Sequence, residues 1–149
     1  MPVFNAHVPA ERFTTLQKQT LATALPLALY DALGIPAEDQ FVVISEHPTG
    51  TLVLNPTYMG MDRSSDATII TVLFTAERPL DDKRTLVRKI CDHTVKALGI
   101  SPDDVFIALI PVPKENFSFG RGELQLAETT TPVQPRSTDQ RSDGVISGL

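Results

Sequence analysis

The stretch Leu33-Gly34-Ile35-Pro36-Ala37-Glu38-Asp39-Gln40-Phe41 recurs 65 positions later as Leu98-Gly99-Ile100-Ser101-Pro102-Asp103-Asp104-Val105-Phe106. In both copies a helical pattern ends at a glycine, the residue that most readily takes the left-handed conformation at a helix end. A second match places Ala10-Glu11-Arg12 against Ala76-Glu77-Arg78, 66 positions apart. The chain therefore contains an internal repeat, covering about residues 2–46 and 67–112.

Each repeat reads as a strand, a helix and a second strand. Apolar and polar residues alternate in the first strand, so Phe4, Ala6 and Val8 share one face. The expected strands are Val3–Val8, Phe41–Ser45, Ala67–Thr75 and Val105–Pro111. The expected helices begin after a cap at Thr14 or Thr15 and at Asp81 or Asp82, and end at about Leu33 and Leu98. For the second helix we expect a buried stripe of Val87, Ile90, Cys91, Thr94, Ala97 and Leu98.

These patterns predict an α+β fold in which a tandem β-α-β repeat forms a four-stranded mixed sheet. A strand-helix-strand crossover makes the strands of each unit parallel and right-handed. Two such units side by side place both helices on one face of the sheet. The other face is too apolar to meet water, so we expect it to be buried against other subunits of an oligomer.

Composition limits the classes of function. A chain of 149 residues is the size of one domain, which we place at 1–126, and the polar segment 127–149 reads as a tail that is mobile or ordered by a neighbouring subunit. The net charge of −5 argues against general nucleic-acid binding. The apolar runs are too short for a membrane span, and no leader pattern begins the chain, so we expect a cytoplasmic protein. No residue cluster has metal-ligand spacing, and we expect no metal or cofactor.

The beginning of the chain, Met1-Pro2-Val3-Phe4, is the candidate for unusual chemistry. A small residue at position two usually permits removal of Met1, which leaves a secondary amine on a rigid ring. An α-amino group titrates at about 7.7–8.0, so such an amine can be tuned to accept or donate a proton near neutrality. Pro2 is therefore either a catalytic amine or simply the residue that happens to follow the initiator methionine, with no role in function.

A tandem β-α-β chain that begins with Met-Pro resembles the tautomerase superfamily, and more closely its malonate semialdehyde decarboxylase-like branch. The resemblance covers roughly residues 2–126. It rests on Pro2, the Gly34–Asp39 turn, Arg63-Ser64-Ser65, Arg78, the Gly99–Val105 run, and Phe117-Ser118-Phe119-Gly120-Arg121-Gly122.

The resemblance implies a homotrimer with an amino-terminal Pro2 at the base of each pocket and a small oxo acid as substrate. At the position of Asp39 the family has an acid that activates water or orients the proline. At the position of Arg78 it has an arginine that holds the substrate carboxylate. The aromatic residues matching Phe117 and Phe119 line the pocket wall in that family. Arg12 is a candidate second charge for substrate binding.

One position departs from the family pattern. Some decarboxylases of this branch carry a second arginine two residues after the first, where this chain has Leu80. Two interpretations of Asp39 stay open as well, because its repeat counterpart Asp104 suggests that both residues simply cap a turn.

The paired chemistry of Pro2 and Arg78 supports two reactions. Arginine binds a carboxylate at two points and presents the adjoining carbonyl to the proline nitrogen. A neutral amine moves a proton between carbon and oxygen, which is tautomerisation, whereas a protonated amine assists loss of CO₂ from a 3-oxo acid. The alternative from another class is a non-catalytic trimeric binding or interaction protein on the same scaffold.

Overall fold

The computed structural model describes residues 2–75 and 77–127. The chain divides into two compact units, Met1–Lys114 and Glu115–Leu149. The first unit holds all the strands of the described chain: β1 (Val3–Pro9), β2 (Val42–His47), β3 (Thr68–Phe74) and β4 (Val105–Pro111). It also holds both long helices, α1 (Thr15–Leu33) and α2 (Leu80–Leu98). Most of the predicted tail, residues 128–149, lies outside the described residues.

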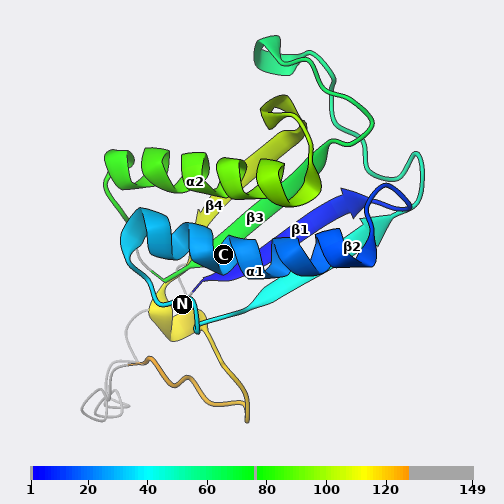
Figure 1. The fold of residues 1–149 in the computed structure, drawn as a ribbon. Helices are drawn as coiled ribbons and strands as arrows, with labels where there is room; N and C mark the ends of the chain where they lie inside the picture. The colour runs from blue at the N-terminus through cyan, green and yellow to red at the C-terminus, as the bar shows by residue number, and fades with distance from the viewer. Residues whose placement is uncertain (1, 76, 128–149) are drawn as a thin grey trace, which may run out of the picture. The chain divides into compact units, whose positions relative to one another are not determined.

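The four strands form one mixed sheet in the order β2-β1-β3-β4. β1 runs parallel to β2, with Phe4 opposite Val42, and β3 runs parallel to β4, with Ile70 opposite Ile107. The two halves meet antiparallel at the centre, where β1 pairs with β3. The helices pack against each other on one face of the sheet (Figure 1). The predicted tandem β-α-β fold with its mixed sheet is therefore confirmed.

Helix α1 begins and ends at the residues that its sequence signals indicate. The Thr14 side chain accepts a hydrogen bond from the Gln17 backbone N–H, and the Gln17 side chain returns one to the Thr14 N–H, which satisfies two otherwise unpaired donors. Gly34 ends the helix at φ 69°, and its N–H donates to the Tyr30 carbonyl. That positive φ disfavours residues that carry a Cβ.

Helix α2 differs from the sequence prediction at its beginning. Its N-cap is Pro79, which provides no side-chain cap, and Asp81 and Asp82 lie in the first turn. The predicted aspartate cap is therefore wrong, because the observed N-cap lies two residues before Asp81 and three before Asp82. The two carboxylates still stabilise the helix, because negative charge is favourable near the positive end of the helix dipole.

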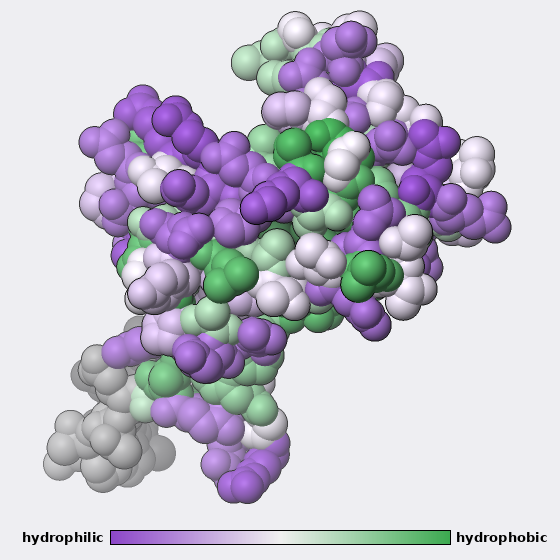
Figure 2. Space-filling model, viewed as in Figure 1, coloured by the Kyte–Doolittle hydropathy of each residue, from purple (hydrophilic) through white to green (hydrophobic). Residues whose placement is uncertain are grey.

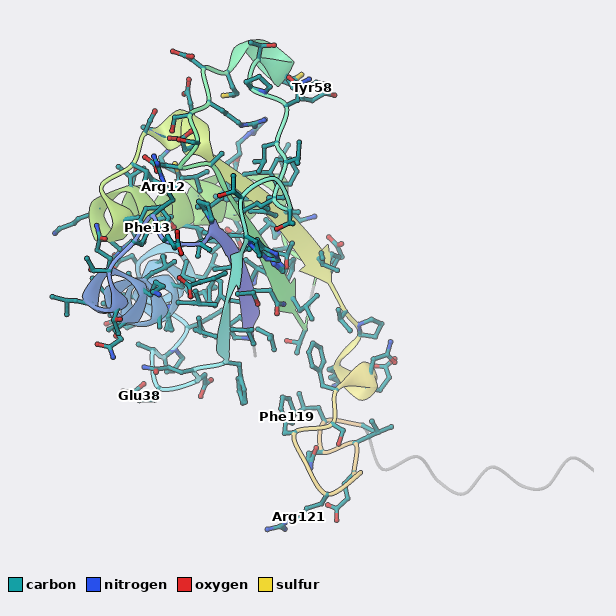
Figure 3. The ribbon with its side chains drawn as sticks, turned by 90° about the vertical axis from the view of Figure 1, so that its right-hand side faces the viewer. Arg12, Phe13, Glu38, Tyr58, Phe119 and Arg121 are labelled. Carbon is teal, nitrogen blue, oxygen red and sulfur yellow. The ribbon has the colours of Figure 1, made fainter. Side chains whose placement is uncertain are left out.

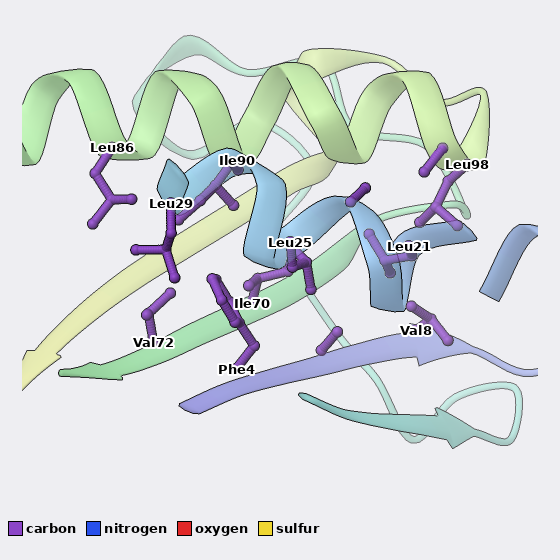
Figure 4. Close-up of a cluster of buried hydrophobic side chains, with 14 of the residues drawn as sticks. Phe4, Val8, Leu21, Leu25, Leu29, Ile70, Val72, Leu86, Ile90 and Leu98 are labelled. Carbon is purple, nitrogen blue, oxygen red and sulfur yellow. The ribbon is translucent and has the colours of Figure 1, made fainter. Parts of the chain in front are cut away.

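The core lies between the sheet and the two helices, and Figure 4 shows its largest members. From the sheet come Phe4, Val8, Ile70 and Val72, and from the helices Leu21, Leu25, Leu29, Leu86, Ile90 and Leu98. In α2 the buried stripe contains Leu86, whereas Val87 and Cys91 are only half-buried. Two of the six residues of the predicted stripe are therefore only half-buried, and Leu86 was missing from the prediction. Figure 2, viewed from the same side as Figure 1, shows hydrophilic residues gathered over α2.

The face of the sheet away from the helices carries apolar side chains with no helix over them. Val43, Phe106 and Ile110 expose 49%, 43% and 40% of their surface. They alternate along their strands with residues that face the helices, as the period of two requires. In the described part of the chain no helix is both long and apolar enough to cross a membrane.

Candidate active site

Pro2 and Arg78, 76 positions apart in the sequence, line one small cavity of about 130 Å³. The sheet brings them together. Val3 at the start of β1 pairs with Leu73 near the end of antiparallel β3, so the residue before β1 meets the segment that follows β3. Thr75 lines the cavity between them, and apolar side chains of α1, α2 and the turn after α1 complete the wall, among them Leu29, Leu86 and Ile35.

Pro2 and Arg78 differ in their surroundings within this cavity. The Pro2 ring is almost fully buried, with less than 2% of its surface exposed. The Arg78 side chain is 36% exposed. Its Nη1 lies 3.7 Å from Oδ2 of Asp82, which is four residues later in the chain. That separation is too long for a hydrogen bond. The guanidinium therefore makes only a loose ion pair with Asp82, and Arg78 also lines the cavity.

Asp39 lies at the same end of the sheet as Pro2 but is not among the described residues that line the cavity. It sits in the turn before β2, where its N–H donates to the Pro36 carbonyl at 3.2 Å. Val42, three residues later, pairs with Phe4. This register places the Asp39 turn beside the beginning of β1. Glu38 marks this turn in Figure 3.

Arg12 lies at the other end of β1 from Pro2. It follows Pro9, the last residue of that strand, and its Nε donates to Asp66 Oδ1 at 2.7 Å. Figure 3 shows Arg12 and Glu38 at opposite ends of the sheet. The structure does not bring Arg12 together with Pro2 and Arg78.

Phe117 and Phe119 form a stacked pair in the second unit. Their ring centroids are 6.0 Å apart and their planes differ by only 4°. Both side chains are half-buried, and Figure 3 labels Phe119. The two aromatic residues singled out by the family resemblance therefore contact each other.

Comparisons with known proteins agree with this fold. A family model described as tautomerase enzyme matches residues 39–120, and a second model with the same description matches residues 2–61. The protein belongs to the tautomerase family. Among curated relatives it is 27% identical to the probable tautomerase YusQ of Bacillus subtilis, over 86% of this chain and all of the relative.

Two solved structures of malonate semialdehyde decarboxylases are also similar to this tautomerase family member. One, described with its decarboxylase and hydratase activities, is 32% identical with a TM-score of 0.73, over 83% of this chain and 94% of that one. The other, the FG41 enzyme inhibited by 3-bromopropiolate, is 28% identical with a TM-score of 0.75, over 83% of this chain and 92% of that one.

The second aspartate of the repeat in this tautomerase-family protein has a structural role. Asp104 is 2% exposed and accepts hydrogen bonds from the Ser64 N–H and the Ser64 hydroxyl, both at 2.7 Å. Arg63 Nε donates to the Asp103 carbonyl at 3.0 Å. Together these contacts anchor the long β2–β3 connection to the turn before β4. The Arg63-Ser64-Ser65 motif thus includes two residues that hold the fold.

Sequence reasoning missed Thr75 and the apolar wall of the cavity. One signal was available for Thr75, because it ends the expected strand and precedes Arg78 by three positions. Leu29, Ile35 and Leu86 gave no such signal, since each reads as an ordinary core residue. The described residues contain no group of three or more His, Cys, Asp or Glu side chains placed to hold a metal ion.

Burial raises the pKa of the Cys91 thiol, and the neighbouring charges of Asp92 and Asp103 raise it further. Because the thiolate is the reactive form, a raised pKa leaves less of it at neutral pH. We expect maleimide labelling of Cys91 at pH 7–8 to be slower than labelling of a cysteine peptide. Asp92→Asn is expected to speed it, and labelling as fast as the peptide's would contradict the raised pKa.

Proposed function

We propose that this protein is a proline-dependent enzyme acting on a small oxo acid, either as a malonate semialdehyde decarboxylase-like enzyme or as a 2-oxo acid tautomerase. The observation that carries the proposal is the cavity that Pro2 and Arg78 share. In this proposal Met1 is removed, Pro2 donates or accepts a proton, and Arg78 holds the substrate carboxylate. The likeness to two malonate semialdehyde decarboxylases supports this substrate class.

The geometry supports different roles for Arg78 and Pro2. Arg78 offers a planar fork of donors at the solvent side of the cavity, and Pro2 lies buried within it. A carboxylate bound at the fork therefore directs the adjoining carbonyl and its neighbouring carbon toward the proline nitrogen. Proton transfer from that carbon to the carbonyl oxygen through a neutral amine gives the enol. A protonated amine instead stabilises the carbanion that forms as CO₂ leaves.

The surroundings of Pro2 bear on the protonation state of its amine. An apolar wall and a nearby guanidinium both disfavour a second positive charge, so they favour the neutral amine and tautomerisation. A nearby carboxylate has the opposite effect. We propose that Asp39, in the turn beside the beginning of β1, is this carboxylate and favours the protonated amine.

The test combines an intact-mass measurement with two assays. We expect the mass of a chain that begins at Pro2, together with turnover of malonate semialdehyde or conversion of an enol to its 2-oxo acid. A retained Met1 would lock the proline nitrogen in an amide and contradict the mechanism. A free proline without turnover of either substrate would favour the second candidate, a trimeric binding or interaction protein. The observation that favours this second candidate is Leu80, which is 60% exposed and stands at the position where some decarboxylases carry a second arginine.

We also propose that three copies of the chain assemble through the open sheet face. Its support is the half-exposed apolar row that includes Val43, Phe106 and Ile110. Light scattering after size exclusion is expected to give about three times the chain mass of 16.3 kDa. Val43→Asp is expected to weaken the assembly, because it would bury an unpaired charge. A monomeric wild-type protein at micromolar concentration would contradict this proposal.

A further inference from the structure

A second, larger cleft adjoins the Pro2 cavity and shares Thr75 with it. The cleft has a volume of about 270 Å³, and its other lining residues are Glu77, Pro111, Val112 and Pro113. The Val112 N–H donates to the Phe74 carbonyl at 2.7 Å, which fixes this wall beside the end of β3. Thr75, three positions before Arg78 in the chain, therefore lines both hollows.

The wall of this cleft is poor in groups that bind an anion. Pro111 and Pro113 have no backbone N–H, and the N–H of Val112 already donates to Phe74. The carboxylate of Glu77 is paired with Lys83 Nζ at 2.8 Å. Among the described residues that line either hollow, Arg78 is the only cation. One cation suits one carboxylate, and Pro111, Val112 and Pro113 offer apolar surface to the rest of a ligand.

The inner cavity is small by comparison. Its 130 Å³ equals about four water molecules of liquid volume. That space suits the carboxylate and carbonyl end of an oxo acid, and the cleft that shares Thr75 offers room for a longer chain.

We propose that the adjoining cleft is a subsite for the apolar tail of the substrate, so that the enzyme prefers monocarboxylic oxo acids with an extended apolar chain over dicarboxylic acids. This inference rests on the proposed function for the identity of the reacting end. It adds Thr75 and Val112 as residues that determine substrate specificity.

The test uses binding of unreactive acids, so that it is independent of turnover. Acetate, butanoate, hexanoate and adipate are titrated into the full-length protein, and each Kd is measured by NMR. Each methylene buried in the cleft is expected to tighten binding about fourfold, so hexanoate binds roughly 16-fold tighter than butanoate. Adipate is expected to bind more weakly than hexanoate, because its second carboxylate would meet the Glu77 carboxylate in the cleft wall, and Lys83 beside it is already paired. Equal affinities along the series, or adipate binding at least as well as hexanoate, would overturn the proposal.

A variant tests the location of the subsite. Val112→Arg places a cation in the cleft and is expected to shift the ratio of adipate to hexanoate affinity at least tenfold toward adipate. Val53→Arg is the matched control, because Val53 is 79% exposed on the β2–β3 connection and lines neither hollow. An unchanged ratio in folded Val112→Arg protein would overturn the proposal. If the chain fails to fold, the wild-type series still decides the outcome.

The two proposals fail separately. Tail-length dependence without turnover of any oxo acid would remove the proposed reaction and leave the subsite in place. Turnover that depends on Pro2, together with binding that does not depend on tail length, would remove the subsite and leave the proposed reaction in place.

Discussion

Pro2→Ala is expected to lower kcat/KM for the oxo-acid substrate by about 10²- to 10⁴-fold, the usual contribution of a positioned acid or base. The variant keeps an amino group but loses the ring, which packs with less than 2% of its surface exposed and fixes the direction of the nitrogen. A primary amine on a freely rotating residue loses that orientation. The measurement is steady-state kinetics of decarboxylation and of enol-to-keto conversion.

Two controls make the Pro2 result specific. Pro56→Ala removes a proline from the exposed β2–β3 connection and is expected to leave kcat/KM within a factor of two of the wild type. A chain with one extra, uncleaved residue before Pro2 keeps the ring but converts the amine to an amide, and it is expected to be as inactive as Pro2→Ala. Wild-type activity in that extended chain would show that the free amine is not needed.

Arg78→Ala is expected to raise KM and lower kcat/KM by about 10²-fold. A hydrogen bond to a charged group contributes about 1.5–3 kcal/mol, and the guanidinium fork offers two such bonds to a carboxylate. Arg78→Lys keeps the charge but loses the planar fork, so its loss is expected to be smaller. Kinetics with a carboxylate substrate and with its neutral ester separate the two effects, because the ester gains little from Arg78.

The neighbours of Arg78 on α2 supply matched controls for this series. Asp82→Asn removes the carboxylate 3.7 Å from Arg78 and is expected to tighten substrate binding by up to about fivefold, since an exposed ion pair is worth about 0–1 kcal/mol. Arg84 pairs with Asp81 outside the Pro2 cavity, so Arg84→Ala is expected to have little effect. Equal losses in Arg78→Ala and Arg84→Ala would indicate a general charge effect and argue against a carboxylate site at Arg78.

Much of the fold could be predicted from patterns among residues that are close together in the sequence. The Thr14 cap, the helix ends at Gly34 and Gly99 and the alternation of Phe4, Ala6 and Val8 all depend on neighbours within one turn or one strand. The cap of α2 was misread because two aspartates follow a proline. Sequence preference alone does not distinguish a side-chain cap from charges in the first turn.

The candidate site was only partly readable. Pro2 and Arg78 were singled out by their chemistry and by resemblance, and the structure brings them to one cavity. Arg12 was singled out in the same way, yet it pairs with Asp66 at the far end of β1. The difference follows from strand direction, because β1 and β3 are antiparallel and only the beginning of β1 meets the end of β3.

Local sequence patterns were enough to establish the repeat, the helix ends and the alternation that assigns one face of each strand to the core. These features depend on contacts between residues close in the chain. The antiparallel pairing of β1 and β3 became known only from the folded chain. The same is true of the arginine that shares a cavity with Pro2 and of the two hollows that Thr75 lines. Those facts depend on how two separately formed β-α-β units bury their apolar faces together, and no local pattern encodes that pairing.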